Sequence, residues 1–465
     1  MNKPTVLLVT DSAHLDTGFG RVAREIGIGL VRSGKFNVVQ HGWFHIPSDK
    51  LIPFCVIPTI QSGKGKGPDA YGEQSYDAVV QHVKPDIVLV VGDEWAIRHI
   101  VSRPRSHKLV GYVPIDAAPL NPEWVSTLKG FDKLVLYGQF AKHTVEWADS
   151  SVKADIIPHG VDLDTFCPVG DVAGVEEFRR QQFGEKWKFI IGCVSRNTAR
   201  KKLPRLIKAF RKFIQPATTC PECSNVFTTD PLLECPACHN TRGLAHTNPK
   251  HDALLYMHTV PTDAHGFRLV PLIARFKLQG YVAMPDGMKV ARGVPDSFLN
   301  MLYNSFDVFT LPTGGEGFGL PLLEAMSAGC PSLAPNYSGH VDFMREGGGE
   351  LIEVSEMETC ISNNGERALA NIEDYVMKLD RFYYEPEEFV KKWGPRYRML
   401  HGEDALANIM TGNQLRRVAS ECARNRAEEY GWPSAIEKWV QLLSSLVDWD
   451  LGNTQAVMPY RAEVL

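Results

Sequence analysis

Short apolar runs alternate with amphipathic segments along most of the chain. The apolar runs are rich in β-branched residues and end at Gly, Pro, Asp or Asn, which is typical of buried strands in a parallel sheet. We expect strands at Val6–Val9, Phe36–Gln40, Pro85–Gly92, Leu109–Val113, Lys133–Leu136, Ile156–Pro158, Phe189–Val194, Ala253–Thr259, Tyr281–Ala283, Asp307–Pro312 and Pro331–Pro335. We expect helices at Arg21–Ser33, Leu203–Ile214, Gly266–Phe276, Pro295–Asn304 and Leu322–Ala328. This alternation predicts an α/β fold of two Rossmann-like domains whose parallel sheets face each other across a cleft.

Two stretches interrupt the alternation. Residues 43–72 are irregular and contain Gly63–Pro68, whose composition favours a solvated loop, although its lysines could meet a phosphate. Residues 169–185 are polar and contain glycine, as expected of a linker. We therefore predict domains at 1–168 and 169–435, with an insertion at 216–247 in the second domain and a last segment at 436–465.

Composition limits the class of protein. The 465 residues are 44% hydrophobic and 22% charged, which is typical of a globular protein. The formal charge of −4 gives no global case for binding nucleic acid, although a local basic patch is compatible with it. We find no apolar run long enough to cross a bilayer and no cleavable signal pattern at the amino terminus. We expect a cytoplasmic protein.

Four of the ten cysteines form two close pairs. Cys220 and Cys223 make one C-x-x-C pair, and Cys235 and Cys238 make the other. This spacing predicts a zinc ribbon in which four thiolates hold a structural zinc ion, whereas a redox role would need a thioredoxin-like setting. The ribbon should emerge at the amino ends of the strands, opposite the cleft, where it could serve stability, oligomerisation or a macromolecular partner.

The stretch from Gly314 to Pro331 carries the clearest candidate site. It places a glycine-rich loop between a strand and a helix, with Glu316 on the loop and Glu324 early in the helix. The backbone amides of Gly317, Phe318 and Gly319 can approach a polar ligand, and a carboxylate can accept hydrogen bonds from vicinal hydroxyls. Glu324 could instead be an ordinary helix-start carboxylate.

Other candidate residues follow predicted strands. Asp93 and Glu94 follow one strand and Asp116 follows the next, and the carboxyl ends of parallel strands face the ligand crevice. Asp116 could also be a turn residue that caps a following segment. Gly18 and Gly20 lie after the first strand, where glycines can admit a phosphate or sugar but can also simply form a tight turn.

The order Glu316, seven residues, Glu324 resembles the EX7E signature of retaining glycosyltransferases of family 4, which have the GT-B fold. The resemblance assigns Glu324 to the ribose hydroxyls of a nucleotide-sugar donor. It assigns the sugar to Glu316 and to the backbone that follows it, at Gly317, Phe318, Gly319 and Leu320. The glycine loop at Gly18 and Gly20 would lie beside the donor diphosphate and the acceptor.

Further segments resemble the same family. Arg196 and Lys201 match its G-R-x-x-x-x-K segment, whose two cations neutralise the donor diphosphate, although a basic run is also typical of a solvated turn. His159–Pro168 resembles the segment that ends the first domain, with histidine in place of the usual asparagine. Many members carry a histidine where this chain has Asp116. A histidine role is therefore not expected here, and Asp116 would contact the sugar or the acceptor instead. Members end in a helix that packs back on the first domain, which is expected here at 436–465.

The resemblance implies a retaining glycosyltransferase that uses a nucleotide-diphosphate sugar, UDP- or GDP-linked, and no catalytic metal. The acceptor is open and includes glycans, metabolites and macromolecules such as DNA with hydroxylated bases; a homo-oligomer is also compatible with the sequence. Two alternatives remain at this point. One is a GT-B phosphorylase or synthase, in which phosphate or a sugar phosphate occupies the basic site. The other is a non-catalytic module whose zinc ribbon binds nucleic acid or protein.

Overall fold

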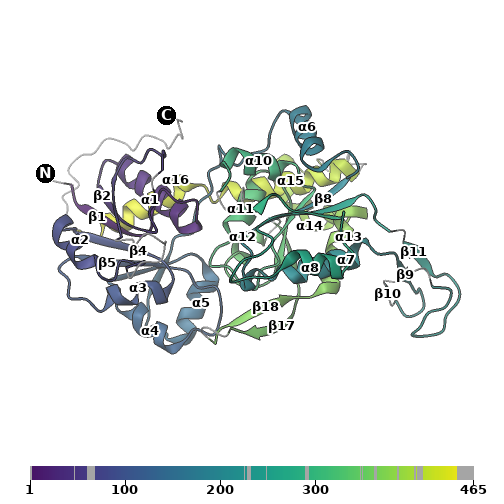
Figure 1. Cartoon of the computed structure of the whole chain (residues 1–465), viewed down its shortest axis with the longest axis horizontal. Coiled ribbons are helices and arrows are strands. Elements are labelled where there is room, and N and C mark those ends of the chain that lie inside the picture. The colour runs from purple at the N-terminus through teal and green to yellow at the C-terminus, as the bar shows by residue number, and fades with distance from the viewer. Residues whose placement is uncertain are drawn as a thin grey trace.

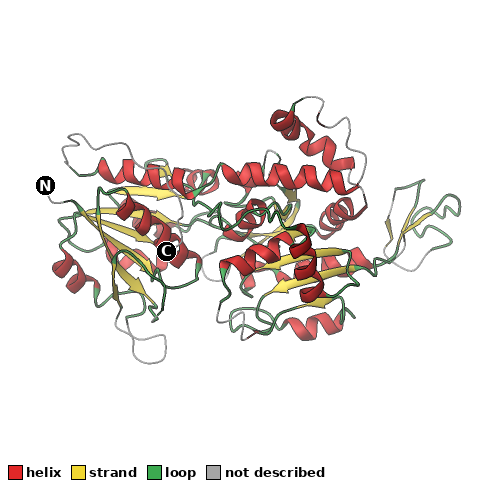
Figure 2. Ribbon diagram, turned by 90° about the horizontal axis from the view of Figure 1, so that it is seen from above, coloured by secondary structure: helices red, strands yellow, loops and turns green. Residues whose placement is uncertain are grey.

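The chain folds into two α/β bodies that lie side by side (Figure 1). The computed structural model describes residues 3–46, 48–59, 69–224, 226–227, 232–247, 249–287, 293–345, 347, 349–360, 364–384, 387–402, 405 and 412–447. Helices cover both faces of each sheet (Figure 2), and a small sheet projects from the second body on the side away from the first. This arrangement confirms the predicted fold class.

The first body contains a parallel sheet in the order β3-β2-β1-β4-β5-β6-β7. Its strands are β1 (Thr5–Asp11), β2 (Asn37–Trp43), β3 (Cys55–Pro58), β4 (Ile87–Val91), β5 (Lys108–Val113), β6 (Lys133–Leu136) and β7 (Ala154–Ile156). Its helices are α1 (Gly18–Arg32), α2 (Tyr76–Val83), α3 (Glu94–Val101), α4 (Pro122–Lys129) and α5 (Gln139–Ala148). The strand order reverses between β1 and β4, so a ligand crevice is expected at their carboxyl ends.

The second body contains a parallel sheet in the order β13-β12-β8-β14-β15-β16. Its strands are β8 (Phe189–Val194), β12 (Ala253–His258), β13 (Val282–Ala283), β14 (Val308–Thr310), β15 (Ser332–Pro335) and β16 (Glu350–Ile352). Around it lie α6 (Val172–Phe183), the 3-10 turn η1 (Ala199–Lys201), α7 (Leu203–Ile214), α8 (Leu269–Arg275), α10 (Asp296–Asn304), α11 (Leu320–Ser327), α12 (Val341–Met344) and α13 (Ile372–Tyr384).

Hydrophobic spacing explains why the central elements form where they do. All five residues of β4 are buried, as expected of a strand covered on both faces. In α7 the buried residues recur every three or four positions, which places them on one face against the sheet. The bounds of β8 and α7 coincide with their predicted bounds. β8 is an unbroken apolar run, and α7 has a clear helical spacing of its apolar residues.

Several predicted bounds were wrong. The stretch predicted to be irregular contains β3, a short edge strand that pairs with β2. Helix α1 begins at Gly18 because the Thr17 hydroxyl accepts a hydrogen bond from the Gly20 amide (3.0 Å) and caps it. Strand β7 ends at Ile156, where the prediction had it begin. The predicted loop at Gly63–Pro68 lies outside the described residues.

Two small antiparallel sheets complete the second body. Strands β17 (Val354–Thr359) and β18 (Glu366–Ala370) form a hairpin beside the first body. Strands β9 (Ala217–Thr219), β10 (Val226–Phe227) and β11 (Ala245–Thr247) form the projecting sheet that carries the paired cysteines. This sheet follows the end of α7 and precedes β12, and Figure 2 shows it far from the junction of the two bodies.

The last helices return the chain to the first body. After α14 (Glu387–His401) and α15 (Gly412–Glu428), helix α16 (Trp432–Ser444) packs against α1. Ile436 lies over Gly29, where a Cβ atom would come within 2.6 Å of it, and Trp439 is fully buried against Tyr112. The domain divisions at 168 and 435 stay predictions, and residues 448–465 lie outside the described part of the chain.

No described helix combines the length and apolar character that a membrane span requires.

Replacing Trp439 with alanine should destabilise the protein by about 3–5 kcal/mol, because it removes a buried indole from the contact between α16 and the first body. Urea unfolding checks the loss. Gln441→Ala, on the exposed side of the same helix, is the control and should change stability by less than about 0.5 kcal/mol. Equal stability of the two variants would contradict the packing role of Trp439.

Candidate functional site

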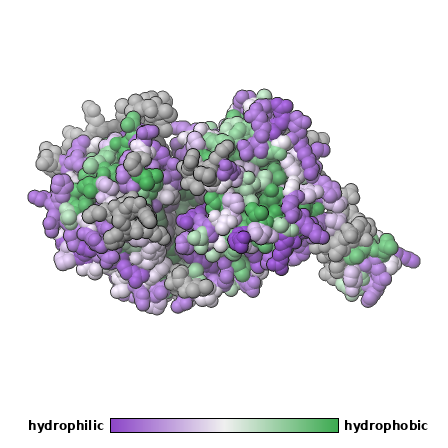
Figure 3. Space-filling view, in the orientation of Figure 1, coloured by the Kyte–Doolittle hydropathy of each residue, from purple (hydrophilic) through white to green (hydrophobic). Residues whose placement is uncertain are grey.

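A hollow lies between the two bodies, as the space-filling view shows (Figure 3). The loop of residues 314–319 follows β14 and presses against the end of β5 in the first body. A Cβ atom at Gly317 would come within 2.7 Å of the Cβ of Pro114, so only glycine allows this approach. Gly319 has φ of 104° and precedes α11, a conformation that also favours glycine. The predicted glycine loop therefore lies at the junction of the bodies.

Glu316 is the buried centre of this loop. One oxygen accepts from the Lys201 ammonium (2.6 Å) and the other from the Arg200 guanidinium (2.9 Å). Its amide donates to the Ser338 hydroxyl (2.8 Å). Burial opposes ionisation, but Arg200 and Lys201 outweigh it and hold the pKa of Glu316 well below its usual range. Glu316 is therefore a carboxylate that orients two cations.

The side chains of the basic segment before α7, residues 195–202, point to different partners. Lys201 is buried beside Glu316, and burial lowers its pKa despite that carboxylate. Arg196 is exposed and pairs with Asp263 (3.1 Å), so the structure does not bring it against Glu316. Arg200, which lies in the same basic run but which no motif singles out, occupies the centre instead.

Asp116 joins this charge cluster from the first body. It pairs with Arg367 of β18 (3.0 Å) and lies 3.6 Å from Arg200. The helix that follows is capped by Asn121, so the capping alternative for Asp116 is wrong. No local pattern in the sequence marks Arg367 as a partner of Asp116, because 251 residues separate the two.

Glu324 forms a second buried contact between the bodies. Its carboxylate accepts from Arg21 of α1 (2.7 Å) and from the Tyr303 hydroxyl (2.9 Å). Arg21 also pairs with Asp296 at the start of α10 (2.5 Å). Burial raises the pKa of Glu324, and Arg21 opposes that rise. Because α11 begins at Leu320, Glu324 lies beyond its first turn, and the helix-start alternative is wrong.

The two glycines of the first loop play different parts. A Cβ atom at Gly20 would come within 2.6 Å of the carbonyl oxygen of Leu15, so this position needs glycine for the turn itself. Gly18 has open space in front of it. Both lie in the first turn of α1, directly before Arg21, whose side chain donates to Glu324.

The four paired cysteines converge in the projecting sheet. Their sulfur atoms all lie within 4.8 Å of one another, and Cys220–Cys238 and Cys223–Cys235 are each 3.6 Å apart. These distances exclude disulfide bonds and fit a set of four thiolate ligands around one tetrahedral ion. Within the described ranges, no other set of three or more His, Cys, Asp or Glu side chains has this geometry.

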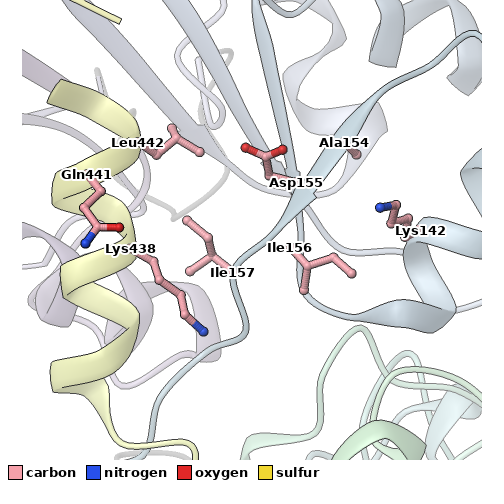
Figure 4. A pocket seen from close by; sticks show the side chains of 8 residues that line it. All are labelled: Lys142, Ala154, Asp155, Ile156, Ile157, Lys438, Gln441 and Leu442. Atoms are coloured by element: carbon pink, nitrogen blue, oxygen red, sulfur yellow. The ribbon is translucent and has the colours of Figure 1, made fainter. Parts of the chain in front are cut away.

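Two cavities differ in their position relative to these residues. The larger, of about 400 Å³, lies away from the charge cluster between β7 and α16, with Lys142 and Lys438 at its sides (Figure 4). The smaller, of about 40 Å³, is lined by Arg21, Asp296 and Glu324 at the junction of the bodies. Only the smaller cavity touches the residues that the sequence motifs single out.

Comparison with solved structures identifies this architecture. Sucrose-phosphate synthase from Thermosynechococcus elongatus superposes with a TM-score of 0.64 at 15% identity, over 96% of this chain and 99% of that chain. Anabaena HepE in complex with UDP and glucose superposes with a TM-score of 0.61 at 15% identity, over 95% of this chain and 100% of that chain. WaaG, a glycosyltransferase involved in lipopolysaccharide biosynthesis, gives a TM-score of 0.58 at 15% identity, over 95% and 99% of the two chains. The chain has a GT-B-like fold.

Sequence comparison agrees with this fold. Residues 273–371, which include the glycine loop, match the family described as Glycosyl transferases group 1, and this match supports a glycosyltransferase. O-antigen chain mannosyltransferase B of Escherichia coli is 33% identical over 100 residues, 18% of this chain. Sucrose-phosphate synthase 1 of Arabidopsis thaliana is 26% identical over 220 residues, 45% of this chain. The matches span 26% and 18% of the lengths of those two curated relatives.

His340 provides a pH test of the glycine loop, against which it packs at Gly319. Its Nε2 donates to the carbonyl of Pro335 (2.7 Å), and its Nδ1 has no hydrogen-bond partner among the described residues. Burial lowers the pKa of His340 to about 4. The unfolded histidine titrates near its ordinary value, so stability should fall as the pH drops below about 6.5.

When the pH is lowered from 7.5 to 5.5, the free energy of unfolding should fall in the wild type. In His340→Asn, which lacks the titrating ring, the fall should be smaller by about 1 kcal/mol. Urea unfolding at the two pH values measures the difference. His82→Asn, at an exposed position, should behave like the wild type. An equal loss in His340→Asn and the wild type would contradict a buried neutral histidine at this position.

Proposed function

We propose that this protein transfers a sugar from a nucleotide-diphosphate sugar to a hydroxyl acceptor with retention at the anomeric carbon. The observation that carries the proposal is the paired arrangement at the junction of the bodies: Glu316 holds two cations, and Glu324 lies buried beside a cavity. A pure scaffold has no need for both. The family match and the UDP-bound neighbour with the same fold support this reading.

Glu324 binds the ribose in this proposal. Its two oxygens are held by Arg21 and Tyr303, which keep the carboxylate oriented before the donor arrives. A carboxylate can accept more than two hydrogen bonds, so vicinal ribose hydroxyls can share or replace these donors. Because Arg21 comes from the first body, donor binding at Glu324 would alter a contact between the bodies.

The diphosphate and the sugar bind on either side of Glu316. Lys201 has three N–H donors and spends one on Glu316, so it can also reach a phosphate oxygen, and the exposed Arg196 can leave Asp263 to do the same. Glu316 and the amides of Gly317, Phe318, Gly319 and Leu320 hold the sugar hydroxyls. Asp116, fixed by Arg367, contacts the sugar or the acceptor.

The residues act by position and charge. The acceptor hydroxyl attacks the anomeric carbon on the face that the diphosphate leaves, and the leaving diphosphate takes the hydroxyl proton. Arg196 and Lys201 stabilise the negative charge that grows on the diphosphate as its bond to the sugar breaks. No side chain needs to form a covalent intermediate.

A donor screen tests the proposal. UDP-, GDP-, ADP- and dTDP-sugars are added to the wild type, and melting temperature and release of free nucleotide are measured. One nucleotide sugar should raise the melting temperature, and Glu324→Gln should abolish the rise, because an amide oxygen accepts ribose hydrogen bonds more weakly than a carboxylate.

Glu437→Gln, an exposed carboxylate on α16, is the matched control and should bind the donor like the wild type. Folded wild type that binds no nucleotide sugar would contradict the proposal and favour a non-catalytic module. Sugar transfer that requires phosphate and releases no nucleotide would favour a phosphorylase.

We infer that the four cysteines hold a structural zinc ion. A closed set of four thiolates leaves no open coordination position, so the ion serves the projecting sheet and not the reaction. Purified protein should contain about one zinc ion per chain, and Cys235→Ser should lose it, because three thiolates bind more weakly than four. Metal analysis measures the content.

Cys55→Ser, at an exposed single cysteine, is the control and should retain the zinc. Donor binding should survive in Cys235→Ser, since the sheet lies away from the junction of the bodies. Metal-free wild type, or loss of zinc in Cys55→Ser, would contradict the assignment.

A further inference from the structure

Asp93 occupies a helix-capping position without capping the helix. It directly precedes α3 with extended backbone angles (φ −64°, ψ 144°), where an aspartate usually accepts a hydrogen bond from a helix amide. Its side chain makes no such bond, and within the described ranges the carboxylate has neither a hydrogen-bond partner nor an ion-pair partner. A carboxylate that gives up the available cap is free to bind something else.

The strand order places Asp93 at the crevice. It follows β4, whose neighbours are β1 and β5, and the reversal of strand order falls between β1 and β4. Asp11 ends β1 and Asp116 follows β5, so three carboxylates come from adjacent strand ends in the first body. Arg200 and Arg367 of the second body pair with Asp116, and their positive charges also lower the pKa of Asp93. Asp93 thus lies at the acceptor side of the proposed transferase.

Aromatic side chains border the same place. The Tyr71 ring makes edge-to-face contacts with Trp43, Phe44 and Trp95, at centroid distances of 5.5, 5.2 and 5.0 Å. Trp95, two residues after Asp93, is 49% exposed. Burial raises the pKa of the Tyr71 hydroxyl, and the charges of Asp11 and Asp93 raise it further. An exposed indole beside an unpaired carboxylate suits a ring that carries hydroxyl groups.

Resting on the proposed function, we propose that Asp93 binds the reacting hydroxyl of the acceptor, with Trp95 and Tyr71 against its ring, and that the acceptor is an uncharged or cationic glycoside. Asp93 accepts a hydrogen bond and orients the hydroxyl oxygen toward the anomeric carbon. The new bond joins that oxygen to the sugar as the bond from the sugar to the diphosphate breaks. The single hydroxyl proton then turns from its hydrogen bond with Asp93 to the leaving diphosphate oxygen, which lies on the same face of the sugar.

The charges at this place disfavour a polyanionic acceptor. The carboxylates of Asp11, Asp93 and Asp116 lie on the acceptor side, and the two facing arginines are already engaged, Arg200 with Glu316 and Arg367 with Asp116. Nucleic acid binding relies on cations that neutralise successive phosphates. A glycoside needs only hydrogen-bond acceptors and an apolar face, both of which are present.

Asp93 should also impose a pH dependence. Burial raises the pKa of Asp93 to about 6. The charges of Asp116 and Asp11 add to this rise, and those of Arg200 and Arg367 oppose it. Tyr71 and Tyr137 are further titratable groups that interact with Asp93. The ionised carboxylate is the better hydrogen-bond acceptor, so turnover should increase as the pH rises through about 6. The uncharged amide of Asp93→Asn should abolish this step.

The test uses the full chain and the donor that the screen identifies. Donor binding is followed by melting temperature, hydrolysis by nucleotide release in water, and transfer with four probes: methyl glucoside, glucosamine, glucose 6-phosphate and an oligonucleotide with hydroxymethylated bases. Asp93→Asn should bind the donor like the wild type but hydrolyse it and transfer the sugar about 100-fold more slowly. Trp95→Ala should hydrolyse it normally and raise the KM for methyl glucoside or glucosamine about tenfold.

Asp155→Asn, at the far edge of the same sheet, and Trp147→Ala, an exposed tryptophan, are the matched controls and should behave like the wild type. Unchanged turnover in Asp93→Asn, or preference for the phosphorylated probe or the oligonucleotide, would overturn this inference alone. Wild type that binds no donor, or that binds one without hydrolysis or transfer, would instead overturn the proposed function on which it rests.

Discussion

The buried contact of Glu316 with Arg200 and Lys201 is the constraint on which the site depends. A carboxylate and two cations can be buried only if they form ion pairs and hydrogen bonds with one another. Removal of one partner from such a buried group typically lowers the free energy of unfolding by about 3–5 kcal/mol. This requirement holds the glycine loop against η1 and brings Arg200 within reach of Asp116 in the first body. The loop, the basic segment and the end of β5 therefore form a single charged unit.

The contacts between the bodies use the residues that the donor would need. Arg21 reaches from α1 to Glu324, and Arg367 reaches from β18 to Asp116. A third contact joins the Gln139 amide to the Asp342 carboxylate (2.6 Å). Because polar contacts of this kind exchange partners more readily than an apolar core, a polar ligand can enter by replacing them. The packing of α16 on α1 is a separate, apolar contact that does not involve these charged residues.

The projecting sheet is separate from this chemistry. Its strands form a small structure that cannot bury a core of its own, and the four clustered cysteines would supply a cross-link if they hold the proposed ion. Strands β9 and β11 join it to the second body at the end of α7 and the start of β12, away from the charge cluster. The fold can therefore carry it without any change to the cleft.

The sequence by itself determined the α/β class, most strands of the two parallel sheets, some of the helices around them, the spacing of Glu316 and Glu324 and the cysteine pairs, because period and spacing are local properties. It misplaced the start of α1 and overlooked β3, where a single cap and a short edge strand leave weak patterns. Only the tertiary structure decided that Arg21 meets Glu324 across 303 residues, that Arg367 fixes Asp116 across 251, and that Asp93 leaves its helix uncapped. The physical reason is that a charged side chain finds its partner through the packing of whole bodies, which no local pattern encodes.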